Sequence, residues 1–222
     1  MRRLRNAAPW LLGVLAASLL FALLFAFASF QYTGSDDAPI LRSFMGYEGG
    51  APATFHLYLH TALAWLLWGL AKLFPGVAWF SIVQLLLLWF SQVVIVKSCA
   101  QLSRRRGYTV WLGALAGLLF LLCYTVFITA RISYTTTAAL LGAAAVAQLA
   151  SVDFGRERRG GVFGPIVGSA LLLLCAYCLR QISMLPPLCF WLLVLAAKLL
   201  TTFGKKGRPW AKAKPVLAGA LA

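Results

Sequence analysis

The chain has 222 residues, of which 62% are hydrophobic and only 11% are charged. Soluble domains carry about 25% charged residues, so this composition excludes an ordinary soluble globular domain. The net charge of +15 would suit a nucleic-acid-binding protein. However, the basic residues mostly lie in short segments between apolar runs, which is typical of membrane proteins and argues against nucleic acid as a partner.

Apolar runs near 20 residues recur along the chain, and a helix of about 20 residues crosses a ~30 Å hydrocarbon core. In lipid the backbone must satisfy its own hydrogen bonds, and the runs are continuous rather than alternating. Helices are therefore predicted instead of a β-barrel. We predict an all-α, polytopic transmembrane helix bundle that forms a single domain over 1–222. The six predicted spans are 8–30, 77–96, 110–129, 135–150, 162–178 and 182–200.

The first predicted span follows a basic N-terminus that contains Arg2, Arg3 and Arg5. A cleaved signal peptide is the alternative, because Ala26-Phe27-Ala28 resembles a cleavage site. A retained helix is favoured, because the apolar core of a signal peptide has only about 7–15 residues. Both alternatives place the N-terminus in the cytoplasm and the following segment outside.

That following segment, 31–54, is predicted to be an exposed outer loop. It holds Asp36, Asp37 and Glu48, which are three of the five acidic residues, together with several glycines and prolines. Residues of these types favour turns and irregular structure.

The apolar segment 55–74 is predicted to lie along the outer interface without crossing. If it crossed, every later basic loop would lie outside, against the positive-inside rule. If it does not cross, those loops are cytoplasmic, and most of the basic residues lie inside. The segment also holds His56, His60 and Lys72, which suit an interfacial helix. The basic residues left over are Arg42, Lys72, Arg131, Arg180 and Lys198.

The later spans follow this topology. Lys97 and the three arginines at 104–106 are assigned to a cytoplasmic basic loop, and Arg131 and Arg180 to outer helix ends. After a basic stretch, the apolar run 215–222 has eight residues, too few to cross a bilayer. This pattern suggests the N-terminal part of a longer bundle.

The order of these segments resembles the N-terminal half of the GT-C membrane glycosyltransferases, the class of the protein mannosyltransferases and aminoarabinose transferases. It also resembles uncharacterised bacterial membrane proteins of this type. A first span is followed by an acidic pair, an interfacial helix, a Pro-Gly break, a span and a basic turn. The segments that carry the resemblance are SDDAP at 35–39, FHLYL at 55–59, 77–106, ISYTTTA at 132–138 and 180–187.

The resemblance implies transfer of a sugar from a polyprenyl-phosphate-linked donor to an acceptor on the extracytoplasmic face. It places the chain in the bacterial plasma membrane. An acceptor hydroxyl must lose its proton as it attacks the anomeric carbon, and a carboxylate can take that proton. Asp36 and Asp37 are the candidate catalytic bases. The alternative is that both are merely solvated in an outer loop.

Basic side chains on the outer side are the candidates for holding a lipid-linked phosphate. Arg131, Arg180 and Lys72 are assigned to this role, together with His56 and Glu48. We predict that Arg131 and Arg180 line one outer-facing cavity with the acidic loop. The alternative for the basic residues is that they reach lipid phosphates at the membrane surface.

His56 and His60 are four residues apart and so share one helix face. With three acidic residues nearby in the sequence they could form a metal site, but interfacial histidines bonded to backbone or water are favoured, and no metal site is predicted. The sequence identifies no cofactor.

The second function class is a non-catalytic membrane protein: a scaffold, an assembly partner or part of a transporter. Transporters usually carry polar or charged residues at mid-membrane. The predicted spans hold few such residues, mainly Gln84, Gln92 and Gln148. This argues against ion coupling but leaves a scaffold open.

Overall fold

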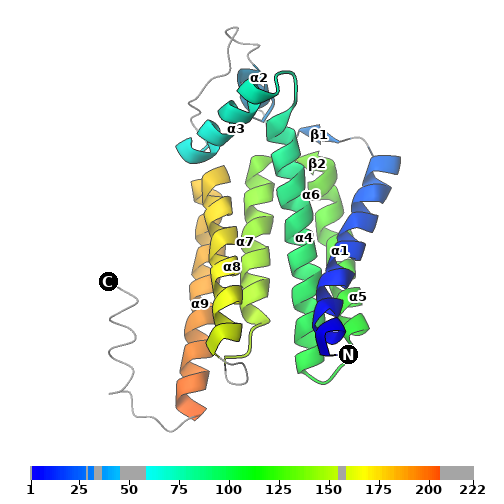
Figure 1. Cartoon of the computed structure of the whole chain (residues 1–222), viewed down its shortest axis with the longest axis vertical. Helices are drawn as coiled ribbons and strands as arrows, with labels where there is room; N and C mark the ends of the chain where they lie inside the picture. Colours follow the sequence, from blue (N-terminus) through cyan, green and yellow to red (C-terminus); the bar gives the residue numbers. More distant parts are fainter. Residues whose placement is uncertain (1, 29, 33–36, 46–58, 155–158, 206–222) are drawn as a thin grey trace.

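The computed structural model describes residues 2–28, 30–32, 37–45, 59–154 and 159–205. The described residues form an all-α helix bundle with one pair of two-residue strands, which confirms the predicted fold class (Figure 1). The helices are α1 (Arg2–Phe27), α2 (Asp37–Phe44), α3 (Thr61–Leu73), α4 (Trp79–Arg105), α5 (Val110–Phe120), α6 (Val126–Ala130), α7 (Tyr134–Ala150), α8 (Arg159–Leu179) and α9 (Gln181–Lys205). A π-helical turn (Leu121–Thr125) joins α5 to α6, and the strands are β1 (Gln31–Tyr32) and β2 (Arg131–Ile132).

Among the described residues, five helical segments are long and apolar enough to cross a membrane. They are Ala7–Phe27, Trp79–Arg105, Val110–Ala130, Val162–Leu179 and Gln181–Thr202. The 17-residue α7 is shorter, but it packs inside the bundle against α4, α8 and α9.

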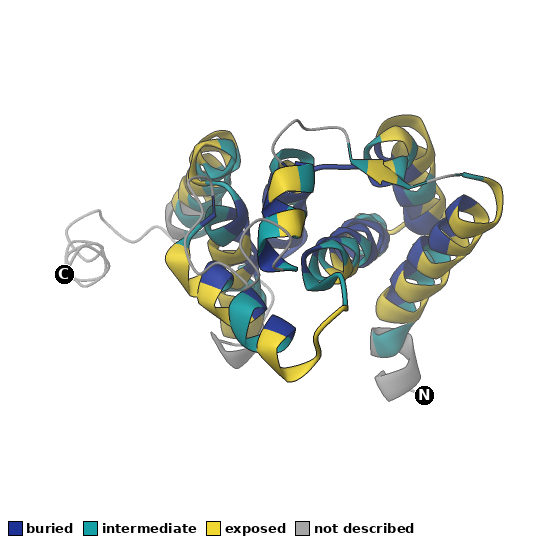
Figure 2. Cartoon of the chain, turned by 90° about the horizontal axis from the view of Figure 1, so that it is seen from above, coloured by how far each residue is buried: buried dark blue, intermediate teal, exposed yellow. Residues whose placement is uncertain are grey.

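The outward faces of the bundle are apolar. Figure 2 shows exposed surface on the outer sides of the helices and buried surface on the sides that face one another. On α1, Leu11, Leu15, Leu19 and Leu23 are all exposed. So large an apolar surface is not stable in water and is the normal surface of a helix in lipid. The chain is therefore a multi-pass membrane protein.

The helices α2 and α3 lie across one end of the bundle, which we call the α2/α3 end (Figure 1). The helix α1 ends and α4 begins at this same end. The 13-residue α3 is about 20 Å long, too short for a ~30 Å hydrocarbon core. The opposite end, where α4 finishes, is called the Arg105 end.

Two features of the α2/α3 end differ from the sequence prediction. The helix α3 begins at Thr61 rather than at 55, because His60 is extended and caps it: Nδ1 of His60 accepts the Ala62 N–H at 3.2 Å. The outer loop 31–54 also contains a helix, α2, that starts at Asp37. Its Pro39 lies in the first turn, where the missing N–H costs nothing, and the acidic first residue favours a helix N-terminus.

The helix α4 is longer than the predicted span 77–96. It continues to Arg105, so Lys97 is buried within a helix, with 4% of its surface exposed, instead of lying in a basic loop. The Nζ of Lys97 lies 4.8 Å from the ring centre of Trp10 on α1. A helix of 27 residues is about 40 Å long, so its last turns extend beyond the hydrocarbon, where charged residues are tolerated.

Small and polar residues fix the contacts between the helices. A Cβ on Gly113 of α5 would lie only 2.4 Å from the Cys99 carbonyl oxygen of α4, so the two backbones touch at this position. Gln92 of α4 donates to Oγ1 of Thr129 at 2.7 Å, and Gln148 of α7 donates to the Pro165 carbonyl at 3.0 Å. Two of the three glutamines that the sequence marks as polar exceptions thus join neighbouring helices.

Candidate functional site

The candidate site is centred on Asp37, the first residue of α2. Its side chain is completely buried, and Oδ1 accepts the backbone N–H of Tyr134 at 3.0 Å. The expected position in an exposed loop is therefore wrong for Asp37. The short helix α2 turns its first residue inward, against the start of α7.

The start of α7 explains why a carboxylate is held here. Ser133 is the N-cap of α7, and its Oγ accepts the Thr135 N–H at 3.3 Å. The N–H of Tyr134 has no partner within the helix, as is usual in a first turn, and it points to Asp37 instead. The partial positive charge of a helix N-terminus stabilises a negative group at this position.

Arg180 contacts the same tyrosine from another helix. This residue follows α8, and its Nη1 donates to the Tyr134 hydroxyl at 3.1 Å and to Oγ1 of Thr135. Its guanidinium carbon also lies 5.1 Å from the centre of the Tyr134 ring. Tyr134 thus binds Asp37 through its backbone and Arg180 through its side chain. Residues from three distant parts of the sequence meet at one point.

The strand pair brings the end of the first helix to the same place. β1 and β2 are parallel, with Gln31 opposite Arg131 and Tyr32 opposite Ile132. The Tyr32 hydroxyl shares a hydrogen bond with Oγ of Ser81 at the start of α4. Burial raises the pKa of Tyr32; the hydrogen bond with Ser81 opposes this rise, and the negative charge of Asp37 adds to it. The strand pair and the bond to Ser81 thus place Tyr32 beside the start of α4.

Sequence reasoning missed Tyr32, Ser81, Tyr134 and Thr135 as members of this group. Tyr134 and Thr135 lie in the ISYTTTA segment that carried the family resemblance, and this was the signal that could have identified them. Tyr32 and Ser81 meet only through the strand pair, and nothing in their local sequence predicts that contact.

The other predicted basic residues are placed less centrally. Arg131 is exposed, and its guanidinium lies 4.5 Å from the ring centre of Phe127. Lys72 is exposed on α3, with Nζ 3.9 Å from the ring centre of Trp68. The hydrogen bond to the Tyr134 hydroxyl comes from Arg180. The cavity shared by Arg131 and Arg180 stays a prediction.

His60 connects α3 to this region. Its backbone N–H donates to the Cys178 carbonyl at 3.0 Å, and its ring lies 5.2 Å from that of Tyr177. Both partners are in the last turn of α8, directly before Arg180. Asp36, Glu48 and His56 lie outside the described residues.

No protein family, curated protein or solved structure matches this chain. The arrangement must therefore be interpreted from its own chemistry.

Two complementary groups lie on either side of Tyr134. The carboxylate of Asp37 can accept a proton, and the guanidinium of Arg180 can bind the oxygens of a phosphate. Asp37 begins α2 and Arg180 lies between α8 and α9, so both are at the α2/α3 end, where the first spanning helix also ends (Figure 1). An amphipathic substrate held at a membrane surface would present its polar group at this level.

Proposed function

We propose that the chain is a GT-C-like membrane glycosyltransferase, or part of one. It transfers a sugar from a polyprenyl-phosphate-linked donor to an acceptor on the extracytoplasmic face. The observation that supports this proposal is the placement of the Asp37 carboxylate and the Arg180 guanidinium on one residue, Tyr134, at the α2/α3 end.

The proposed reaction uses these two side chains in different roles. The acceptor oxygen attacks the anomeric carbon while Asp37 takes its proton. The bond between that carbon and the phosphate oxygen breaks, and its electron pair leaves with the polyprenyl phosphate. Arg180 stabilises the negative charge that develops on the departing phosphate. Asp36 remains the alternative base, and Arg131, Lys72, His56 and Glu48 are the further candidates for binding the donor.

A non-catalytic membrane protein is the second candidate. One observation favours it: Asp37 is completely buried and bonded to a backbone N–H, which is also the arrangement of a structural helix cap. In that case the carboxylate would only hold α2 on α7.

A transfer assay separates the two functions. The full chain is reconstituted in proteoliposomes with a labelled polyprenyl-phosphate sugar, and the release of labelled sugar to acceptors is measured. We expect transfer by the wild-type chain and none by the Asp36→Asn/Asp37→Asn double variant. Asn preserves the size and the acceptor oxygen of each side chain, so a structural cap survives the change. Equal transfer by both proteins would exclude both aspartates as the base, and no transfer by the wild-type chain would favour the scaffold.

We further propose that the protein lies in the bacterial plasma membrane with its N-terminus in the cytoplasm. The basic Arg104, Arg105 and Arg106 lie at the same end of the bundle as the start of α1 (Figure 1). The positive-inside rule places that end in the cytoplasm and the α2/α3 end outside.

Cysteine labelling tests this orientation. Single cysteines replace Ser43 in α2 or Ser103 near the end of α4, in a chain whose five native cysteines are changed to serine. A membrane-impermeant maleimide added to intact cells should label the Ser43 variant and spare the Ser103 variant. Permeabilised cells provide the control, in which both should react. Labelling of Ser103→Cys from outside would reverse the proposed orientation.

A further inference from the structure

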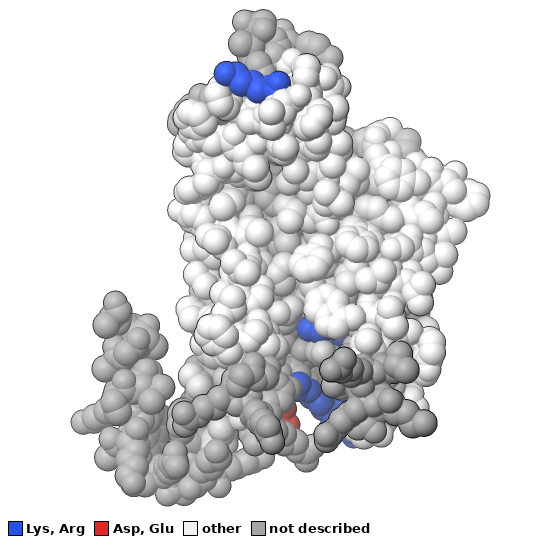
Figure 3. Space-filling view, viewed as in Figure 1, with Lys and Arg blue, Asp and Glu red and all other residues white. Residues whose placement is uncertain are grey.

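A second site lies far from Asp37, in the half of the bundle nearer the Arg105 end. A cavity of about 370 Å³ is lined by residues of α1, α4, α7 and α8. Figure 3 shows basic side chains recessed between the helices in the lower part of this face, whereas the middle of the face is uncharged among the described residues. Lys97 is the basic residue that lines the cavity.

Lys97 is the residue of the cavity that can bind an anion. Its side chain is 4% exposed and faces the ring of Trp10, and Gln101 and Gln148 line the same space. The described residues that line the cavity include no carboxylate. A cation in a space without a carboxylate is suited to bind the negative group of a ligand.

The depth of Lys97 matches the level of lipid phosphates. Counting about 20 residues from the start of α4 at Trp79 takes the helix across the hydrocarbon core to Ser98. Lys97 therefore lies at the boundary between hydrocarbon and headgroups. Trp10, which lines the same cavity, is of the residue type that favours this boundary.

The rest of the cavity suits a hydrocarbon chain. Phe90 and Leu172 line it on the side away from the Arg105 end. On α8, a Cβ added to Gly164 would meet nothing within 4 Å, so this wall has open space beside it. The cavity thus combines a cation at one level with apolar walls deeper in the bundle.

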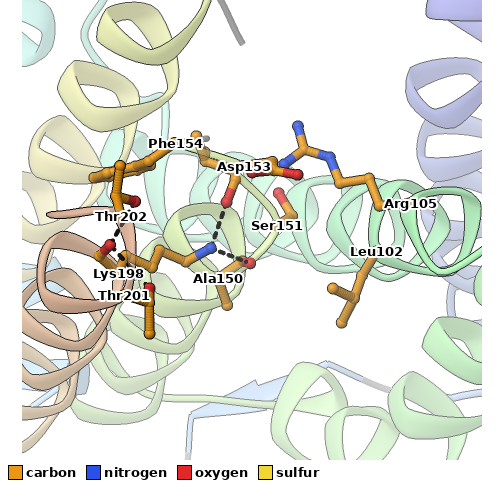
Figure 4. A pocket seen from close by; sticks show the side chains of 10 residues that line it. Leu102, Arg105, Ala150, Ser151, Asp153, Phe154, Lys198, Thr201 and Thr202 are labelled. Carbon is orange, nitrogen blue, oxygen red and sulfur yellow. Dashed lines mark hydrogen bonds between the residues drawn. The ribbon is translucent and has the colours of Figure 1, made fainter. Parts of the chain in front are cut away.

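A neighbouring pocket at the Arg105 end contains a second lysine, which is half-buried. It has a volume of about 210 Å³, and its Lys198 donates to the Ala150 carbonyl at 2.8 Å and to the Val152 carbonyl (Figure 4). The side chains of Arg105 and Asp153 point toward one another there. The two backbone carbonyls thus hold the Lys198 ammonium group within this pocket.

We propose that the Lys97 cavity binds one anionic phospholipid, with its phosphate at Lys97 and an acyl chain along Phe90 and Leu172. This site is independent of the proposed transferase reaction. In the proposed orientation the lipid comes from the cytoplasmic leaflet.

Native mass spectrometry of the full chain tests the proposal. The protein is purified in detergent and titrated separately with phosphatidylglycerol, phosphatidylcholine, diacylglycerol and inorganic phosphate. We expect one phosphatidylglycerol to bind at least about tenfold more tightly than phosphatidylcholine, because the cation recognises net negative charge. Lys97→Met should remove this preference, and Gly164→Leu should weaken binding because leucine fills the open space.

Two matched variants control for these changes. Arg106→Met removes an exposed cation at the same end of the bundle, and Gly69→Leu adds a leucine where a Cβ also meets nothing within 4 Å. Both should bind phosphatidylglycerol as the wild type does. Equal binding of the two phospholipids, or an unchanged preference in Lys97→Met, would overturn the proposal. Saturation of the site by inorganic phosphate alone would show a free-anion site instead. If Gly164→Leu does not fold, the lipid preference of Lys97→Met alone tests the proposal.

Discussion

The single variant Asp37→Asn is expected to lower sugar transfer by about 10²–10⁴-fold, the usual contribution of a general base. Asn keeps an oxygen that can accept the Tyr134 N–H, so the bond that joins α2 to α7 can form in the variant. What is lost is the ability to take a proton. Initial rates in proteoliposomes, with donor and acceptor varied separately, should therefore show a fall in kcat at a nearly unchanged KM for the donor.

The matched control is Asp36→Asn, one residue earlier in the chain. It carries the same chemical change but should keep most of the activity if Asp37 is the base. The reverse result, with Asp36→Asn inactive and Asp37→Asn active, would leave Asp37 as a structural cap. Thermal unfolding of each variant in detergent shows whether the fold is retained.

Gly113→Ala is expected to destabilise the bundle by about 1–3 kcal/mol, the usual cost of overpacking. The added Cβ would lie 2.4 Å from the Cys99 carbonyl oxygen and 2.8 Å from Cα of Ala100, both of which belong to the backbone of α4. A backbone cannot rotate away as a side chain can, so α5 must move as a whole. For a protein of this size the midpoint of thermal unfolding should fall by roughly 2–12 °C.

Gly69→Ala is the control for helix propensity. A Cβ at Gly69 in α3 meets nothing within 4 Å, so alanine should be neutral or slightly stabilising there. Tryptophan fluorescence during heating of the detergent-solubilised chain measures both variants. A similar shift in the two would mean that the contact between α4 and α5 is not responsible.

The spanning helices could be predicted because the length of an apolar run is a local property of the sequence. The predicted span 135–150 differs from α7 by one residue, since Ser133 supplies the cap. The errors arose where tertiary contacts determine whether a segment is helix or loop. Lys97 was assigned to a loop because it is charged, although a cavity and Trp10 accommodate it inside α4. The helix α2 was missed because its glycine- and proline-rich surroundings predict a loop.

The candidate site was predictable in its residue types but not in its connections. Asp37 and Arg180 are both among the predicted site residues, because a carboxylate that accepts a proton and a cation that binds phosphate suit the expected chemistry on the outer side. Their common partner, Tyr134, follows from the packing of three helices and from the position of β1 beside β2. No pattern along the chain encodes that contact.

The bond between Asp37 and Tyr134 also imposes an order on biosynthesis. The two residues are 97 positions apart. At a translation rate of about 5–20 residues per second, roughly 5–20 s pass between their synthesis. The helix α1 is made before this interval and α4 during it. Until α7 begins, the first turn that binds Asp37 does not exist, and the carboxylate must remain hydrated. The Asp37 site is therefore completed only after α7 has been inserted, and Arg180 joins it later still.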